Sequence, residues 1–95
     1  MRPRQIELAR HALGLDGRRT HSYRNSYVCG PSPEHTEWCD MVEEGDATRT
    51  DGSKVHFGGD DLFRLTLQGA RKALLPAETL DREDFPDAAR APIEP

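Results

Sequence analysis

A helix that starts after Ser32 constrains the fold more than any other segment of this sequence. Ser32 is a favoured N-cap residue, Pro33 suits the first helical position, and Glu34 places a negative charge near the positive end of the helix dipole. The apolar residues that follow recur at three- and four-residue spacing and form one stripe: Trp38, Met41 and Val42, broadened by Cys39. The pattern predicts an amphipathic helix over residues 33–44, ended by Gly45, with Trp38 in the core.

Two further helices are predicted from the same periodicity. Apolar residues at helical spacing predict a helix over residues 3–14, which Gly14 and Gly17 end. Thr66 is a suitable N-cap for a last helix over residues 66–75.

Short β segments are predicted between these helices. Residues 47–49 and 55–57 flank an Asp-Gly turn and predict a hairpin, and residues 62–66 alternate with Phe63 and Leu65 on one face. Gly58 and Gly59 favour a tight turn before that strand. Residues 16–28 begin with turn formers and then alternate, with Tyr23 and Tyr27 as the bulky side chains. This segment is predicted to be a loop, with or without a short strand.

Two segments of the second half carry a recognisable pattern. Residues 41–49 read Met-Val-Glu-Glu-Gly-Asp-Ala-Thr-Arg, and residues 63–70 read Phe-Arg-Leu-Thr-Leu-Gln-Gly-Ala. Together they resemble winged-helix domains of the multiple-antibiotic-resistance-regulator type, in which a β wing follows a helix and Leu-Thr-x-x-Gly opens the next one. The resemblance implies an α+β, winged-helix-like fold over residues 1–75, with about three helices and a small two- or three-stranded antiparallel β wing. Asp46 stands where those proteins usually carry an apolar residue.

The chain also resembles a group of small uncharacterised phage and prophage proteins over roughly residues 5 to 75. The matching elements are Tyr23-Arg24-Asn25, Gly30-Pro31, Gly58-Gly59-Asp60 and the Leu-Thr-x-x-Gly segment that ends at Gly69. This resemblance implies a phage accessory protein and no particular activity.

Length and charge exclude several classes of protein. The 95 residues are enough for one domain, and the net charge of −4 gives no global cationic field for coating nucleic acid. No apolar run approaches the roughly 18 residues of a membrane helix, so we expect no membrane partner and a location in the cytoplasm of a bacterial host cell. Residues 76–95 form an acidic, proline-rich tail. We expect this tail to be mobile unless it docks on a partner or on the core.

Charge is divided unevenly along the chain, and its negative part gives the leading functional hypothesis. Residues 1–24 carry a net +4, so the remainder carries −8. The predicted helix 33–44 contains no Lys or Arg, which argues against insertion into a DNA groove. Its acidic residues could instead imitate nucleic acid and occupy a cleft of a host or defence protein, as expected of an anti-CRISPR or anti-restriction protein. These residues are Glu34, Glu37, Asp40, Glu43 and Glu44.

Two alternatives remain open. A small winged-helix transcriptional regulator could bind DNA phosphates through its Arg-rich N-terminal end, alone or as a homodimer. It would use Arg18, Arg19, Tyr23, Arg24 and Tyr27. A zinc-stabilised module could use a His2Cys2 set formed by His21, Cys29, His35 and Cys39, although short paired knuckles are missing.

Enzyme motifs are weak in this sequence. Cys29 with His21 or His35 as a base has no marked orienting group, and Asp60 with Asp61 is a short acidic pair without a third ligand. Phosphate-loop, dinucleotide-binding and His-Glu-x-x-His motifs are not found in the sequence. We therefore expect a non-enzymatic protein with no cofactor and no resident metal.

Overall fold

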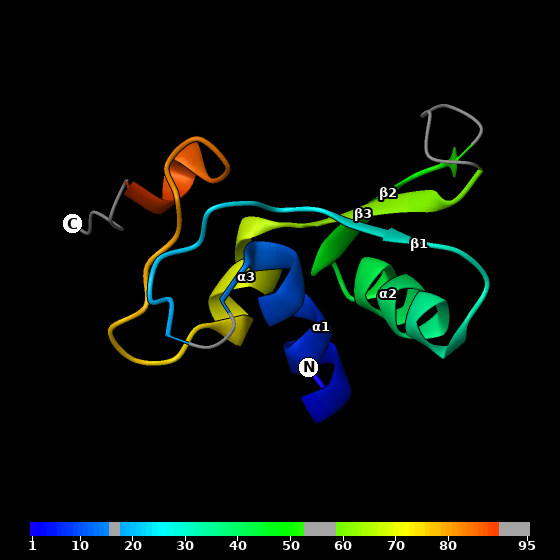
Figure 1. The fold of residues 1–95 in the computed structure, drawn as a ribbon, viewed down its shortest axis with the longest axis horizontal. Helices are drawn as coiled ribbons and strands as arrows, with labels where there is room; N and C mark the ends of the chain where they lie inside the picture. The colour runs from blue at the N-terminus through cyan, green and yellow to red at the C-terminus, as the bar shows by residue number, and fades with distance from the viewer. Residues whose placement is uncertain (16–17, 53–58, 90–95) are drawn as a thin grey trace.

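The computed structural model describes residues 1–15, 18–52 and 59–89, which form an α+β domain with a winged-helix-like arrangement (Figure 1). Its regular elements follow in chain order: α1 (Pro3–Leu13), β1 (Tyr27–Cys29), α2 (Pro33–Glu43), β2 (Ala47–Thr50), β3 (Asp61–Leu65) and α3 (Leu67–Ala73). A 3-10 turn, η2, spans Pro86–Ala89. The predicted fold class is thus confirmed.

The helix ends lie within two residues of the predicted ones, because the capping residues act as expected. The Ser32 hydroxyl accepts the amide of His35 at 3.2 Å, and the Thr66 hydroxyl accepts the amide of Gly69 at 3.1 Å. Gly14 ends α1 in the left-handed conformation, with φ 79°. Helix α3 stops at Ala73, because Leu74 is extended and Pro76 follows two residues later.

The sheet has the strand order β1-β3-β2 and is antiparallel throughout. Tyr27 pairs with Phe63, and Ala47 pairs with Leu65. The strand expected at residues 47–49 is present as β2, and its partner in the sheet is β3, in which Arg64 alone is exposed. The expected return strand at residues 55–57 lies outside the described residues.

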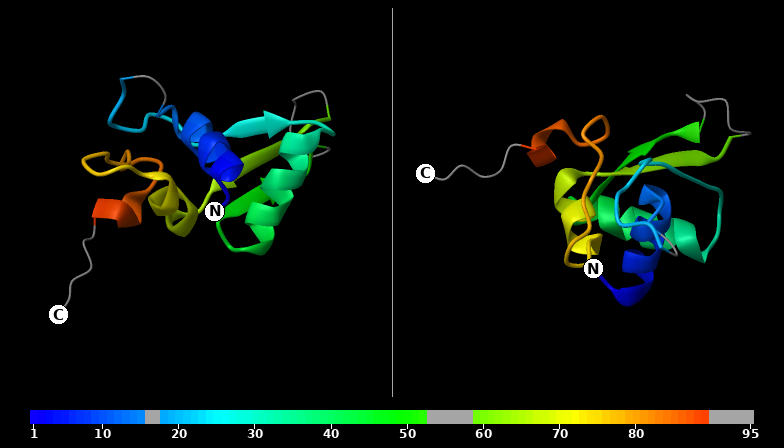
Figure 2. Two further views of the ribbon diagram at one scale, coloured as in Figure 1. Left: turned by 90° about the horizontal axis from the view of Figure 1, so that it is seen from below. Right: turned by 60° about the vertical axis from the view of Figure 1, so that its left-hand side comes forward.

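All three α-helices lie on one side of the sheet, and Figure 2 shows the same arrangement from two further directions. Trp38 of α2 is fully buried between two rings, stacked on Phe63 at 5.4 Å and tilted against Tyr27 at 5.3 Å. Such aromatic contacts stabilise the core beyond the contribution of the buried apolar area. Trp38 and Phe63 are core residues, as predicted.

Asp46, the residue that departs from the winged-helix pattern, connects α2, β2 and α3. It is 2% exposed, yet it is fully hydrogen bonded: its carboxylate accepts from Gln68 and Lys72, and its carbonyl accepts the amide of Thr66. A polar residue is tolerated here because α3 supplies the donors. Gly69 allows this approach, since a Cβ there would lie 1.9 Å from the Asp46 carbonyl oxygen.

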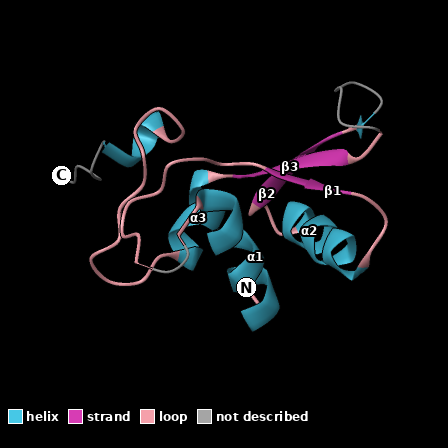
Figure 3. Cartoon of the chain, viewed as in Figure 1, coloured by secondary structure: helices cyan, strands magenta, loops and turns pink. Residues whose placement is uncertain are grey.

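The segment from Pro76 docks on the core. The sequence predicted that this segment would be mobile unless it docked on a partner or on the core. Leu80 and Phe85 belong to the buried cluster, at 8% and 4% exposure. Figure 3 shows this segment running beside the loop between α1 and β1. There the Thr79 carbonyl accepts the amide of Ser22, and the Thr79 amide donates to the carbonyl of Thr20. Residues 76–89 therefore pack as part of the domain; residues 90–95 lie outside the described part.

Within that described part, no helix combines the length and the apolar character needed to cross a lipid bilayer.

Candidate functional site

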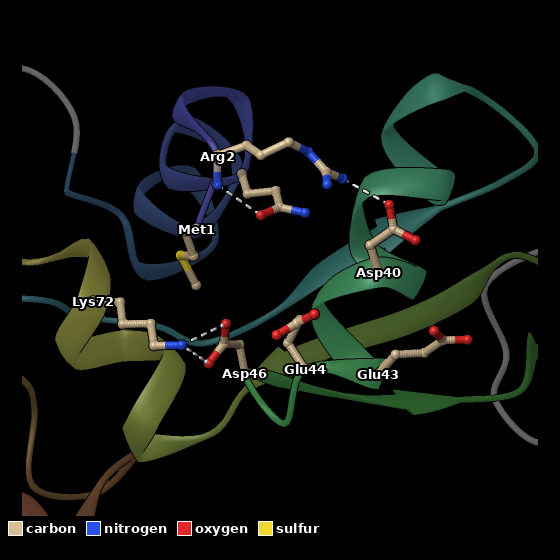
Figure 4. A pocket seen from close by; sticks show the side chains of 8 residues that line it. Met1, Arg2, Asp40, Glu43, Glu44, Asp46 and Lys72 are labelled. Atoms are coloured by element: carbon tan, nitrogen blue, oxygen red, sulfur yellow. Dashed lines mark hydrogen bonds and ion pairs between the residues drawn. The ribbon is translucent and has the colours of Figure 1, made fainter.

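A pocket of about 500 Å³ opens where the start of the chain, the end of α2 and α3 meet (Figure 4). Met1, Arg2 and Gln5 line one side, and Lys72 of α3 lines another. The acidic lining comes from the end of α2 and the turn after it: Asp40, Glu43, Glu44 and Asp46. Four carboxylates thus meet two side-chain cations.

The two cations are already engaged by carboxylates. Arg2 contacts Asp40 at 2.6 Å and Glu37 at 2.7 Å, and Lys72 contacts Asp46 at 3.0 Å. Burial alone would raise the pKa of Asp46, but the hydrogen bonds from Gln68 and Lys72 outweigh it and hold that pKa below its ordinary value. Asp46 therefore stays ionised and belongs to the framework of the pocket.

Glu43 and Glu44 are the acidic lining residues left without a cation. Both are exposed, and neither forms an ion pair with any residue that the structure describes. They lie at the C-terminal end of α2, whose last turn contains no basic residue. The helix dipole is negative there and favours cations, so two adjacent glutamates are locally unfavourable for the helix. This arrangement attracts a positively charged group from outside.

The other three acidic residues of the predicted face, Glu34, Glu37 and Asp40, are ion-paired within the chain. Glu34 contacts Arg4 at 2.8 Å, and its pKa lies below the ordinary value because of a hydrogen bond from its own backbone amide and the one from Arg4. Glu37 shares Arg2 with Asp40. The structure therefore divides the predicted acidic face into a paired part facing α1 and an unpaired part at the pocket.

The Arg-rich loop forms a second charged cluster on the chain. The guanidinium of Arg19 lies 4.3 Å from the centre of the Tyr23 ring, and that of Arg24 lies 5.1 Å from it. Arg24 also donates two hydrogen bonds to the carbonyl of His11 at the end of α1. Arg18 is exposed. Tyr27, expected in this cluster, instead packs between His11 and Trp38.

The four candidate zinc ligands are not brought together. His35 and Cys39 are neighbours, with 3.6 Å between Nδ1 and Sγ, but His21 contacts Thr79 and the Cys29 thiol donates to the Gly30 carbonyl. Across residues 1–15, 18–52 and 59–89, no three His, Cys, Asp or Glu side chains are placed to hold a metal ion. The His2Cys2 hypothesis is corrected accordingly.

The segment Tyr23-Arg24-Asn25 has structural roles. Tyr23 covers Gly14, where a Cβ would lie 2.1 Å from the Tyr23 ring, and Arg24 caps α1. Asn25 exchanges two hydrogen bonds with the backbone of Leu65, at 2.8 and 3.0 Å, and so continues the pairing of β1 with β3. These residues hold α1 on the sheet.

A polar cluster around Asp61 was not predicted as a unit. Asp61 accepts hydrogen bonds from His35 Nε2, Arg49 Nε and the amide of Gly52, each at 2.8 Å. The donors from His35, Gly52 and Arg49 lower its pKa to about 2. The sequence signal was the His35-to-Cys39 spacing on one helix face; the third member lies 26 residues from His35 in the chain and becomes a neighbour only through the fold.

The chain matches no family model, and no curated protein or solved structure matches it. The fold and the charged sites described above are therefore the basis for any functional conclusion.

Proposed function

We propose that this chain is a non-enzymatic phage accessory protein that binds a basic surface of another macromolecule. The partner is a host nucleic-acid-handling or defence protein, which the chain inhibits in the manner of an anti-CRISPR or anti-restriction protein. The observation that carries the proposal is the pair of carboxylates without an ion-pair partner among the described residues, Glu43 and Glu44. They line the pocket at the C-terminal end of α2.

The pocket is suited to a guanidinium or ammonium group. A planar guanidinium can donate to two carboxylates at once, and such charge-assisted hydrogen bonds are stronger than neutral ones. Arg2 and Lys72 hold Asp40 and Asp46 in place, so the lining is organised before a ligand arrives. A protein cleft that normally holds phosphates presents the arginines and lysines that this site would receive.

The acidic site also explains why α2 tolerates an unfavourable end. Local rules are broken at functional sites more often than elsewhere, because function rather than stability selects the residues there. Glu43 and Glu44 gain nothing from the helix dipole, and no cation within the described residues pairs with them. Binding of a basic partner would relieve this repulsion.

The direct test is an NMR titration of the protein with an arginine-rich peptide at low and high salt. We expect amide shifts at residues 40–46 and an affinity that falls as salt rises. The double variant Glu43→Lys and Glu44→Lys should lose binding. Its matched control is Glu83→Lys with Asp84→Lys, which makes the same charge change on another exposed acidic segment.

A pull-down from bacterial lysate, with and without nuclease treatment, then tests whether the partner is a protein. The proposal expects a nuclease-resistant protein that the wild type and the control variant retain and the Glu43 and Glu44 variant does not. Equal binding by all three proteins would refute the role of this site.

A second candidate function, DNA binding by a small regulator, is favoured by the cluster on Tyr23. Arg19 and Arg24 stack on a ring that is 49% exposed, and neither they nor Arg18 form an ion pair with a described carboxylate. Unpaired arginines beside an exposed aromatic ring can contact a phosphate and stack on a base.

This candidate predicts DNA affinity that decreases steeply with salt. Fluorescence anisotropy with labelled duplex and single-stranded DNA should show weaker binding for Arg18→Ala with Arg19→Ala. Arg71→Ala with Arg82→Ala is the control, since both of these arginines are also exposed. No measurable binding at low salt would exclude this function.

A further inference from the structure

Three side chains from two separate elements form a hydrogen-bonded line between α2 and the start of β3. The Cys39 sulfur lies 3.6 Å from Nδ1 of His35, and Nε2 of His35 lies 2.8 Å from a carboxylate oxygen of Asp61. Cys39 and His35 are four residues apart on α2, so they share one face of the helix. Asp61 comes from the start of β3.

The direction of the hydrogen bonds follows from the charge of Asp61. This carboxyl remains ionised over the whole physiological range, because the pKa of Asp61 is about 2. An ionised carboxylate only accepts hydrogen bonds, so Nε2 of His35 must carry the hydrogen. In the neutral imidazole, Nδ1 then has a free lone pair, and this lone pair is directed at the Cys39 thiol.

The imidazole is held firmly in this orientation. Asp61 is 8% exposed and is itself fixed by Arg49 and by the amide of Gly52. The His35 ring also packs edge-on against Phe63, with 5.4 Å between ring centres. A base with an orienting carboxylate behind it and a thiol in front of it is the arrangement that activates a cysteine nucleophile.

We propose that Cys39 is a reactive thiol that undergoes exchange with small disulfides, with His35 as its base and Asp61 as a positioning residue. The Cys39 proton passes to Nδ1 of His35, and the thiolate attacks one sulfur of the disulfide. A new sulfur–sulfur bond forms as the old one breaks, and the departing thiolate takes the proton from His35. The products are a mixed disulfide on α2 and one free small thiol, so the disulfide is the oxidant and the step balances.

The second cysteine serves as an internal comparison. Cys29 is 7% exposed, and its thiol contacts the Gly30 carbonyl and the Ser32 hydroxyl rather than an imidazole. Buried cysteines without a base are unreactive. Cys39 is only partly buried, and the His35 side chain is 25% exposed, so a small reagent can reach the pair.

Charged groups surround the pair on two elements. Arg49 of β2 pairs with Asp61, and Glu43 lies one helical turn beyond Cys39 on α2. The firm contact between His35 and Asp61 makes the imidazole the group whose removal should matter most. This expectation sets the choice of variants.

The experiment measures the rate at which glutathione disulfide modifies the intact protein, followed by mass spectrometry and peptide mapping. At pH 6, we expect Cys39 to react at least about tenfold faster in the wild type and in Cys29→Ser than in His35→Gln. Glutamine keeps an amide donor toward Asp61 but provides no base. The Cys39→Ser variant should take up no glutathione.

The pH profile separates activation from a purely structural role. Below about pH 8, the reaction rate of an ordinary cysteine increases about tenfold for each unit by which the pH is raised, because its thiolate fraction increases. The wild type should show a shallower rise between pH 6 and 8, and His35→Gln and Asp61→Asn should restore the steeper one. Near-ultraviolet circular dichroism of Trp38 confirms that each variant is folded. Equal rates and equal profiles for wild type and folded His35→Gln would overturn the proposal.

Discussion

Gly69→Ala provides the most stringent test of the packing at the wing. Gly69 lies within α3, and replacing glycine by alanine in a helix normally stabilises it by about 1 kcal/mol. Here the added Cβ would lie 1.9 Å from the carbonyl oxygen of Asp46 and 2.7 Å from its carbon. Both are backbone atoms, so no side-chain rotation relieves the overlap. The start of α3 must move away from Asp46 by about 1.5 Å before an ordinary contact of about 3.4 Å is reached.

That movement disrupts the bonds that satisfy Asp46. The Thr66 amide bonds the Asp46 carbonyl at 3.0 Å, and Gln68 bonds its carboxylate at 2.8 Å. Leaving a buried acceptor without its partner costs about 1–3 kcal/mol, and overpacking costs about as much again. After the gain in helix propensity is subtracted, we expect a loss of about 3 kcal/mol in the free energy of unfolding, or roughly 10–20 °C in Tm.

Urea unfolding followed by the fluorescence of the buried Trp38 measures this loss. Gly30→Ala is the matched control, because its Cβ would meet only the carboxylate end of Asp60, at 2.8 Å, and this side chain can turn away. The control should lose less than about 1 kcal/mol. If Gly69→Ala unfolds at the same urea concentration as the wild type or at a higher one, the close approach of α3 to Asp46 is refuted.

Three further predictions concern acid stability, the segment after α3 and the acidic site. Because the pKa of Asp61 is lowered to about 2, its contribution to stability is complete above about pH 4 and is lost as the pH falls toward 2. In urea titrations, the difference in the free energy of unfolding between the wild type and Asp61→Asn should therefore decrease as the pH falls from about 4 to about 2. Phe85→Ala should cost about 3 kcal/mol in the same assay, and a neutral result would place this ring outside the core. Glu43→Gln with Glu44→Gln should leave the free energy of unfolding unchanged or raise it by a few tenths of a kcal/mol while weakening binding of the arginine-rich peptide; a large loss of stability would contradict the dipole argument.

Local signals allowed most of the fold to be predicted. The caps at Ser32 and Thr66 and the apolar stripe around Trp38 lie within a few residues of one another in the chain, so propensity and periodicity were sufficient to detect them. The pairing of β2 with β3 was less accessible, because it depends on which residues bury a common face rather than on turn chemistry alone. The docking of Phe85 depends on a surface formed by distant segments.

Charge was the least predictable property of the site. Composition shows how many acidic and basic residues the chain contains, but not which of them meet. The pairing of Arg2 with Glu37 and Asp40 joins residues 35 and 38 positions apart, and it removes part of the acidic face that the helix alone predicted. Likewise, Asp61 gives His35 an orienting partner that no local pattern indicates.

The position of the motif residues suggests where function should be sought. Tyr23, Asn25 and Gly69 each fill a defined structural position, against Gly14, the Leu65 backbone and the Asp46 carbonyl respectively. These three residues therefore stabilise the fold, and the fold alone does not determine what the chain binds. The side chains of Glu43 and Glu44, which have no ion-pair partner among the described residues, contribute little to the fold and remain available for binding. Substitutions at the end of α2 should therefore leave this architecture unchanged, whereas substitutions at Asn25 or Gly69 should disturb it.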